Sequence, residues 1–127
     1  MKLIRIPLIG SIPDLTKLPS ERSSIYLRKA WTLSRMSDVN YQRNSIGCVL
    51  IHRRRIVGVG TETDSYDGLA NAMRSIDVHD SELPYVRAFV IMTNRKTGSI
   101  IPMADEYISS KSDGKFVDAA IGTIYFV

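Results

Sequence analysis

The chain has 127 residues, of which 44% are hydrophobic and 24% charged, so it can build one compact domain with a core. Its net charge of +4 comes from 17 basic and 13 acidic residues that are interspersed, which predicts a mixed solvated surface that still permits anionic partners. A single cysteine excludes a disulfide-stapled secreted fold, and the apolar runs are too short to cross a membrane, so we expect a cytoplasmic protein with no membrane partner.

The first 19 residues are predicted to form an extended arm, because prolines recur in them at positions 7, 13 and 19. Residues 2–6 of this arm alternate weakly between polar and apolar side chains, which allows a short edge strand. The arm is expected to lead into a single α/β domain over residues 20–127.

A first helix is expected over residues 20–37. Ser20 is a good N-cap directly after a proline, and the residues that follow carry apolar side chains at helical spacing. The inner side of this helix is predicted to hold Tyr26, Ala30 and Leu33.

Residues 45–52 and 55–61 are rich in β-branched and apolar side chains and flank a short basic turn, which predicts a hairpin of two antiparallel strands. In the second strand, Ile56, Gly58 and Gly60 alternate with Val57 and Val59.

A second helix is predicted to begin at Asp67, whose carboxylate can accept hydrogen bonds from the free amides of the first turn. Its apolar residues fall at the spacing of one buried helical face, namely Leu69, Ala72, Met73 and Ile76. We expect this helix to connect the hairpin to a strand over residues 85–93 that runs parallel to its neighbour in the sheet. That strand is apolar on both faces, as is typical of the middle of a sheet covered by helices on each side.

Residues 94–115 allow two interpretations. One is a helix followed by a parallel strand, and the other is a hairpin around residues 94–98. The favoured prediction is a short hairpin or turn and then a helix near residues 103–111. Residues 122–127 are expected to form the final strand of the sheet.

Three of these segments, taken in order, resemble the core of the cytidine and deoxycytidylate deaminases. They are the glycine-led strand over residues 46–51, the strand over residues 55–60 that ends in Gly-Val-Gly, and the helical run Ala-Asn-Ala-Met-Arg-Ser-Ile over residues 70–76. The resemblance covers residues 20–93 and implies a three-layer α/β sandwich with a mixed sheet. It also implies a homo-oligomer, and a chain that stops at the family's fourth strand and leaves an uncovered sheet edge near Val127.

The catalytic motif of that family is missing from the matched positions. Zinc deaminases need a His or Cys ligand, a Glu two residues later and a further pair of cysteines. Here Ala70 stands at the ligand position and Ala72 at the Glu position, while residues 93–98, which include Thr97, replace the two-cysteine turn. Methyl groups neither bind Zn²⁺ nor move protons, so we expect no cofactor and no deamination, and the sequence argues against an enzyme without closing the question.

Three hypotheses about function follow. The first is a catalytically inactive deaminase-like protein that binds a macromolecular partner in a regulatory or inhibitory role. The second is a nucleic-acid-binding module that uses a basic hairpin turn together with a second basic pair, which would lie close by only if the sheet order matches that of the family. These residues are Arg53, Arg54, Arg55, Arg95 and Lys96, and the alternative for the turn is a merely solubilising role.

The third hypothesis is a divergent enzyme that acts on nucleotides through three carboxylates, those of Glu62, Asp64 and Asp67. Such a cluster permits Mg²⁺ but is not diagnostic, and Asp67 is more simply a helix cap. The two histidines, His52 and His79, are predicted to have surface or capping roles, and no metal site is expected from them.

Overall fold

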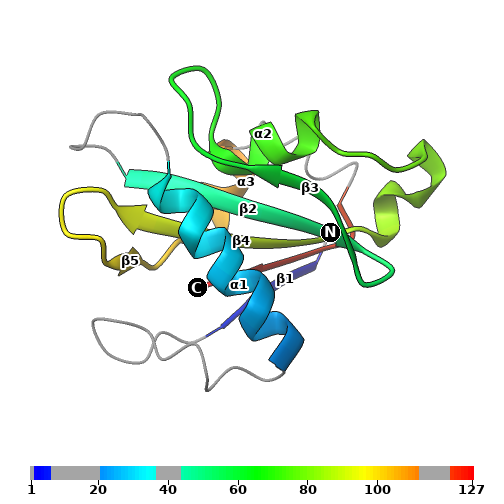
Figure 1. Cartoon of the computed structure of the whole chain (residues 1–127), viewed down its shortest axis with the longest axis horizontal. Coiled ribbons are helices and arrows are strands. Elements are labelled where there is room, and N and C mark those ends of the chain that lie inside the picture. Colours follow the sequence, from blue (N-terminus) through cyan, green and yellow to red (C-terminus); the bar gives the residue numbers. More distant parts are fainter. Residues whose placement is uncertain (1, 7–20, 37–43, 112–120) are drawn as a thin grey trace.

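The computed structural model describes residues 2–6, 21–36, 44–111 and 121–127 and has an α/β fold (Figure 1). The predicted start of the first helix at Ser20 and most of the predicted arm lie outside the described residues. The elements in chain order are β1 (Lys2–Arg5), α1 (Glu21–Arg35), β2 (Asn44–His52), β3 (Arg55–Gly60), α2 (Gly68–Arg74), the 3₁₀-helix η2 (Asp80–Tyr85), β4 (Arg87–Asn94), β5 (Ile100–Ile101), α3 (Asp105–Lys111) and β6 (Thr123–Phe126).

The strands form one mixed sheet of six strands in the order β1-β6-β4-β2-β3, with β5 paired to β4. Strand β2 runs antiparallel to both β3 and β4, whereas β4, β6 and β1 run parallel to one another. Six consecutive residues of β4 are buried, as the apolar character of residues 85–93 on both faces predicts.

Helices cover both faces of the sheet, which gives three layers. On one face, α1 packs through Leu27 and Ala30 on a core that includes Val49 and Phe89. The approach is very close, since a Cβ added at Gly47 would lie 2.0 Å from the carbonyl oxygen of Ala30. Helices α2 and α3 cover the other face, whose core residues are Ile46, Cys48, Leu50, Val57, Leu69, Ala72, Met73, Val86, Ala88, Val90, Met92, Met103, Ile108, Ile121, Ile124 and Phe126.

A β-bulge interrupts the predicted alternation of β3. Leu50 pairs with Gly58, but Ile51 pairs with Ile56, so Val57 is an extra residue on β3. The bulge turns the side chain of Val57 into the core. A strict two-residue period would have placed residues 57 and 58 on opposite faces of the sheet, but both face this core.

One prediction about strand direction is wrong. The strand over residues 85–93 was expected to run parallel to its neighbour through the second helix, but the strand beside β4 on that side is the antiparallel β2. Strands β3 and β4, which α2 connects, do run in the same direction because both are antiparallel to β2. The sequence pattern does not show that β2 lies between them.

The predicted uncovered edge near Val127 is also wrong, because β1 pairs in parallel with β6 along its whole length. The amide of Lys2 donates to the carbonyl of Gly122 at 2.9 Å, and the amide of Ile6 donates to that of Phe126 at 2.6 Å. The weak alternation of residues 2–6 thus did mark a strand, and its backbone supplies the hydrogen bonds that the edge of β6 requires.

The favoured interpretation of residues 94–111 is confirmed, since β4 and β5 form a short hairpin and α3 follows. The final strand is confirmed as β6. Within the described part of the chain, none of the helices is long and apolar enough to cross a membrane.

Candidate functional site

Ala70 and Ala72, which the sequence resemblance aligns with the catalytic residues of deaminases, occupy packing positions in this structure. Ala72 is fully buried and Ala70 is 8% exposed, both on α2. A Cβ added at Gly60 would lie 2.4 Å from the backbone nitrogen of Ala72, so helix and strand touch here without space between them. This part of α2 binds the sheet by close contact and offers no polar side chain from either alanine.

The carboxylates near the start of α2 do not form a cation site. Asp67 caps the helix, with its Oδ1 accepting from the amide of Ala70 at 2.8 Å. Asp67 and Glu62 are buried whereas Asp64 is exposed, and the described residues contain no group of three His, Cys, Asp or Glu side chains able to hold a metal.

Cys48 lies beneath this helix in the centre of β2 and is fully buried. Burial raises the pKa of the Cys48 thiol well above its usual range, and the negative charge of Asp67 raises it further. The thiol is therefore held in its neutral form, which is neither a strong nucleophile nor a metal ligand.

The turn between β4 and β5 is a structural turn. The Oδ1 atom of Asn94 accepts from the amides of Lys96 at 2.9 Å and Thr97 at 3.1 Å. The guanidinium group of Arg95 donates to the carbonyl of Arg35, the last residue of α1, and so ties the helix end to the turn. Of the second basic pair, Lys96 is exposed, whereas Arg95 is half-buried.

The structure does not bring the two basic groups together. Asn44 pairs with Asn94 at one end of β2, and Ile51 pairs with Arg87 at the other end. Seven residue steps at roughly 3.4 Å put about 24 Å between these ends. The β2–β3 turn and the β4–β5 turn therefore lie at opposite ends of the sheet, as Figure 1 shows.

The β2–β3 turn has an unusual backbone. His52 pairs with Arg55, which leaves only Arg53 and Arg54 in the turn, and their φ angles are 50° and 66°. Positive φ at both central residues defines the type I′ turn, in which Asn-Gly is the preferred sequence. An arginine in this left-handed conformation costs about 1 to 2 kcal/mol.

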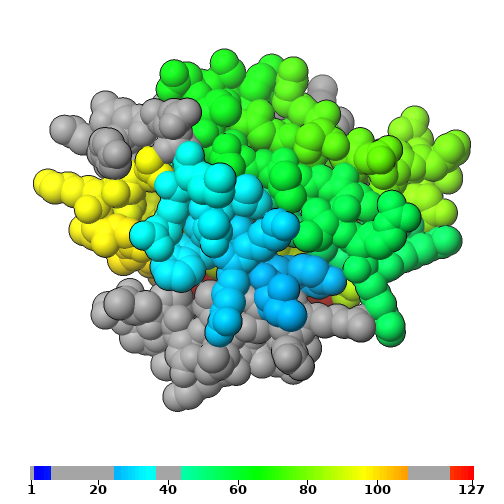
Figure 2. Space-filling model, viewed as in Figure 1, coloured from blue at the N-terminus to red at the C-terminus, as the bar shows by residue number. Residues whose placement is uncertain are grey.

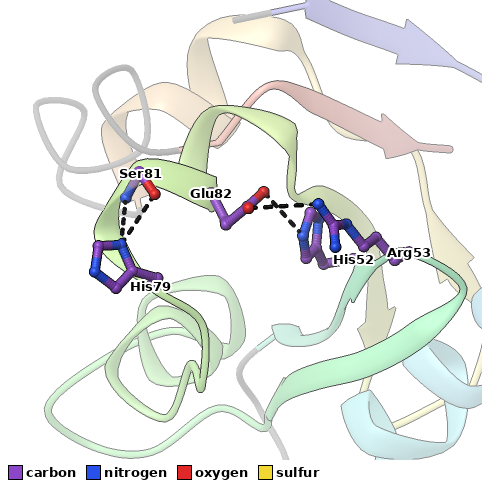
Figure 3. Close-up of polar contacts among 5 residues, drawn as sticks. All are labelled: His52, Arg53, His79, Ser81 and Glu82. Atoms are coloured by element: carbon purple, nitrogen blue, oxygen red, sulfur yellow. Dashed lines mark hydrogen bonds and ion pairs between the residues drawn. The ribbon is translucent and has the colours of Figure 1, made fainter.

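Further residues gather at this end of the sheet. Glu82 of η2 faces the neighbouring side chains of His52 and Arg53, with 3.2 Å from its Oε2 to the Nε2 of His52 and 3.5 Å from its Oε1 to an Nη of Arg53 (Figure 3). Tyr85, at the end of η2, is 70% exposed, and the first residue of β4, Arg87, is exposed as well. We call His52, Arg53, Arg54, Arg55, Glu82, Tyr85 and Arg87 the hairpin end.

Two shallow pockets border the hairpin end. One has a volume of about 520 Å³ and is lined by His52, Arg53, Glu82, Tyr85 and Arg87. The second, of about 280 Å³, shares the first three of these residues and extends to Asp77 and His79. His79 caps the start of η2 through its Nδ1, which accepts from the amide of Ser81 at 3.3 Å and lies 2.9 Å from the hydroxyl of that residue (Figure 3). The sequence placed this histidine at the end of the second helix instead, where the structure has Ser75 as the C-cap of α2.

Sequence reasoning identified three arginines of the hairpin end and missed the other members. Glu82, Tyr85 and Arg87 follow the hairpin by some thirty residues, and only the pairing of β4 with β2 brings them to its turn. Arg87 did carry a local signal, since it is a lone cation at the start of an otherwise apolar strand.

Comparisons of the chain with protein-family models, with curated proteins and with solved structures found no match. The structure itself establishes the class of fold, which is a three-layer α/β domain with a mixed six-stranded sheet. The function must therefore be argued from the geometry of this chain.

Proposed function

We propose that the protein acts by binding a macromolecular partner through the hairpin end, on a deaminase-like scaffold that does not catalyse deamination. The observation that carries this proposal is the pair Arg53 and Arg54 in a type I′ turn. Both side chains are exposed, and that of Arg53 is 77% exposed.

The left-handed backbone argues against a merely solubilising turn. Asn-Gly or Asp-Gly would keep the turn polar and would relieve the strain of two arginines. The two-residue turn requires this backbone but not these side chains, and strained residues of this kind are typical of binding sites. Glu82 further holds Arg53 in place, which reduces the entropy that its side chain would lose on binding.

The resemblance to deaminases supports the scaffold and not the chemistry. Ala70 and Ala72 are buried, and neither methyl group can bind zinc or transfer a proton. Binding is the activity that remains open to this arrangement of residues.

Self-association, which the resemblance implies, would have to use a surface other than the outer edge of β3. The carbonyl of Val57 accepts from the amide of Asp77 at 2.9 Å, and that of Val59 accepts from the hydroxyl of Ser75 at 3.1 Å. The chain that follows α2 thus occupies the acceptors through which a second sheet would add to this edge.

The proposal is tested by comparing two variants in an extract of the native host. Replacement of Arg53, Arg54 and Arg55 by Ala should abolish the capture of material that the parent protein retains, and should change the free energy of unfolding by less than about 0.5 kcal/mol because the turn is exposed.

In the matched control, Arg95 and Lys96, the basic pair at the opposite end of the sheet, are both replaced by Ala. This variant should retain the same material as the parent. Equal capture by the hairpin variant, or no specific capture by the parent, would remove the basis of the proposal.

A further inference from the structure

We infer that the partner is a single-stranded nucleic acid, whose phosphates contact the arginines of the hairpin end and one of whose bases stacks on Tyr85. This inference rests on the proposed function and names the chemical class of its partner. An acidic protein is the competing class, and the experiment below separates the two.

The first argument is an excess of guanidinium groups. Four arginines stand at this end of the sheet. Of these four, only Arg53 has a side chain that pairs with a carboxylate among the described residues, that of Glu82, at 3.5 Å. The side chains of Arg54, Arg55 and Arg87 are exposed. A planar guanidinium group binds two phosphate oxygens at once, which makes arginine well suited to a phosphate backbone.

The second argument is the arrangement of these groups in space. Arg87 begins β4, Arg55 begins β3, and Arg53 and Arg54 form the turn that follows β2, so the four arginines stand at the same end of three neighbouring strands. Strands in a sheet lie about 4.8 Å apart, so the backbone positions of these arginines spread over about 10 Å across the strand ends. In Figure 2, side chains in the colours of the hairpin extend beyond the body of the molecule at the right, where an extended chain can reach them.

The third argument is Tyr85, which distinguishes a nucleic acid from an acidic peptide. Its ring is 70% exposed and lines the pocket of about 520 Å³ together with Arg53 and Arg87. An exposed aromatic ring beside cations is the arrangement on which unpaired bases stack, and in a duplex the stacking of neighbouring base pairs would hide the face that the ring needs. A chain of carboxylates has no planar base to stack on this ring, although the phenol hydroxyl can donate a hydrogen bond to a carboxylate.

Fluorescence anisotropy with the full chain tests the inference. The probes are labelled 20-nucleotide single strands of DNA and of RNA, the matching duplex and a labelled polyglutamate of similar length, each measured over a series of salt concentrations. The parent should bind at least one of the single strands about tenfold more tightly than the duplex or polyglutamate. The comparison of DNA with RNA identifies the sugar that is preferred.

Two substitutions separate stacking from charge. Tyr85→Ala should weaken binding of the single strand about tenfold without changing its dependence on salt, whereas Tyr85→Phe should keep the affinity. Arg54→Ala should reduce the slope of log affinity against log salt by about 0.7, the value for one phosphate contact on a single strand.

The controls are a tyrosine and a cation outside the hairpin end. Tyr66 is 44% exposed and also lies beside an arginine, 4.3 Å from its ring centre to the guanidinium carbon of Arg74, so Tyr66→Ala should leave binding unchanged. Lys96→Ala should leave the salt slope unchanged.

Equal affinity of the parent and Tyr85→Ala, or binding of polyglutamate as tight as that of the single strand, would overturn the inference. A second outcome separates the inference from the proposed function. If no oligonucleotide binds, but the parent captures a nuclease-resistant partner from the extract that the hairpin variant does not capture, the inference fails and the proposed function stands. If neither effect is seen, both fail.

Discussion

At the scale of single residues, the turn between β2 and β3 has a sequence that lowers the stability of the hairpin at the positions that we propose for binding. Arg53 and Arg54 hold φ angles of 50° and 66°, where the Cβ atom lies too close to the following carbonyl oxygen. Asn and Gly adopt these angles readily. The sequence of the turn is therefore not the one that would best stabilise the hairpin.

The double substitution Arg53→Asn with Arg54→Gly should increase the free energy of unfolding. Relief of strain contributes about 1 kcal/mol for each residue, and the greater freedom of glycine in the unfolded chain offsets less than that, so we expect a net gain of about 1 kcal/mol. Urea denaturation measures this gain, and partner binding should fall in the same variant.

Replacing both residues by Lys is the matched control, because it keeps the charge and the left-handed backbone. The free energy of unfolding should then stay at the value of the parent. A loss of stability in the Asn-Gly variant would mean that contacts such as that between Arg53 and Glu82 hold the hairpin together, which would contradict the strain argument.

At the scale of elements, β1 closes the sheet beside β6. Deletion of residues 1–6 should lower the melting temperature, because it removes the whole β1–β6 pairing, the flanking hydrogen bonds to residues 122 and 126, and the side chain of the buried Ile6. It should also expose the outer edge of β6 and produce self-association that rises with protein concentration. Calorimetry and light scattering measure the two effects.

Lys2→Ala is the control for this deletion, since it keeps the backbone pairing and removes an exposed side chain. It should melt like the parent and scatter like it. A deletion variant with unchanged melting and no concentration dependence would show that β1 contributes little to the sheet.

The elements also show where sequence reasoning reaches its limit. The hairpin, the cap at Asp67, the buried strand β4 and the β4–β5 turn follow from local patterns, and the structure has them. The bulge at Val57 breaks a two-residue period that looked regular, and it lies next to Gly58, where β3 closely approaches the backbone of Ala72 in α2. Sheet order and the partner of β6 depend on contacts between distant segments, which a local pattern does not carry.

At the scale of the whole molecule, the same limit applies to the candidate site. Arg53, Arg54 and Arg55 stand together in the sequence and were identified from it. The hypothesis that groups them with Arg95 fails, because Arg95 lies at the opposite end of strand β2. The side chains that complete the hairpin end come from η2 and β4, which the sheet brings to the turn. A site assembled across strands becomes visible only when the register of the sheet is known.

The last prediction concerns what holds the whole fold together. Structural zinc can supply roughly 10–16 kcal/mol of apparent binding energy in small domains. In this chain α2 is attached to the sheet by packing instead, through Leu69 and Met73, each 2% exposed, and through the two alanines at the positions that match the deaminase catalytic residues. A chelator should therefore leave the melting temperature unchanged, and the purified protein should carry no stoichiometric zinc and release no ammonia from cytidine, deoxycytidine or their monophosphates.

Leu69→Ala shows whether the melting measurement is sensitive to the attachment of α2. Removal of this buried side chain should lower the free energy of unfolding by about 2 to 5 kcal/mol, equally with and without chelator, because the lost contacts are apolar. Stoichiometric zinc in the purified protein, together with a fall in melting temperature on chelation, would contradict the packing argument.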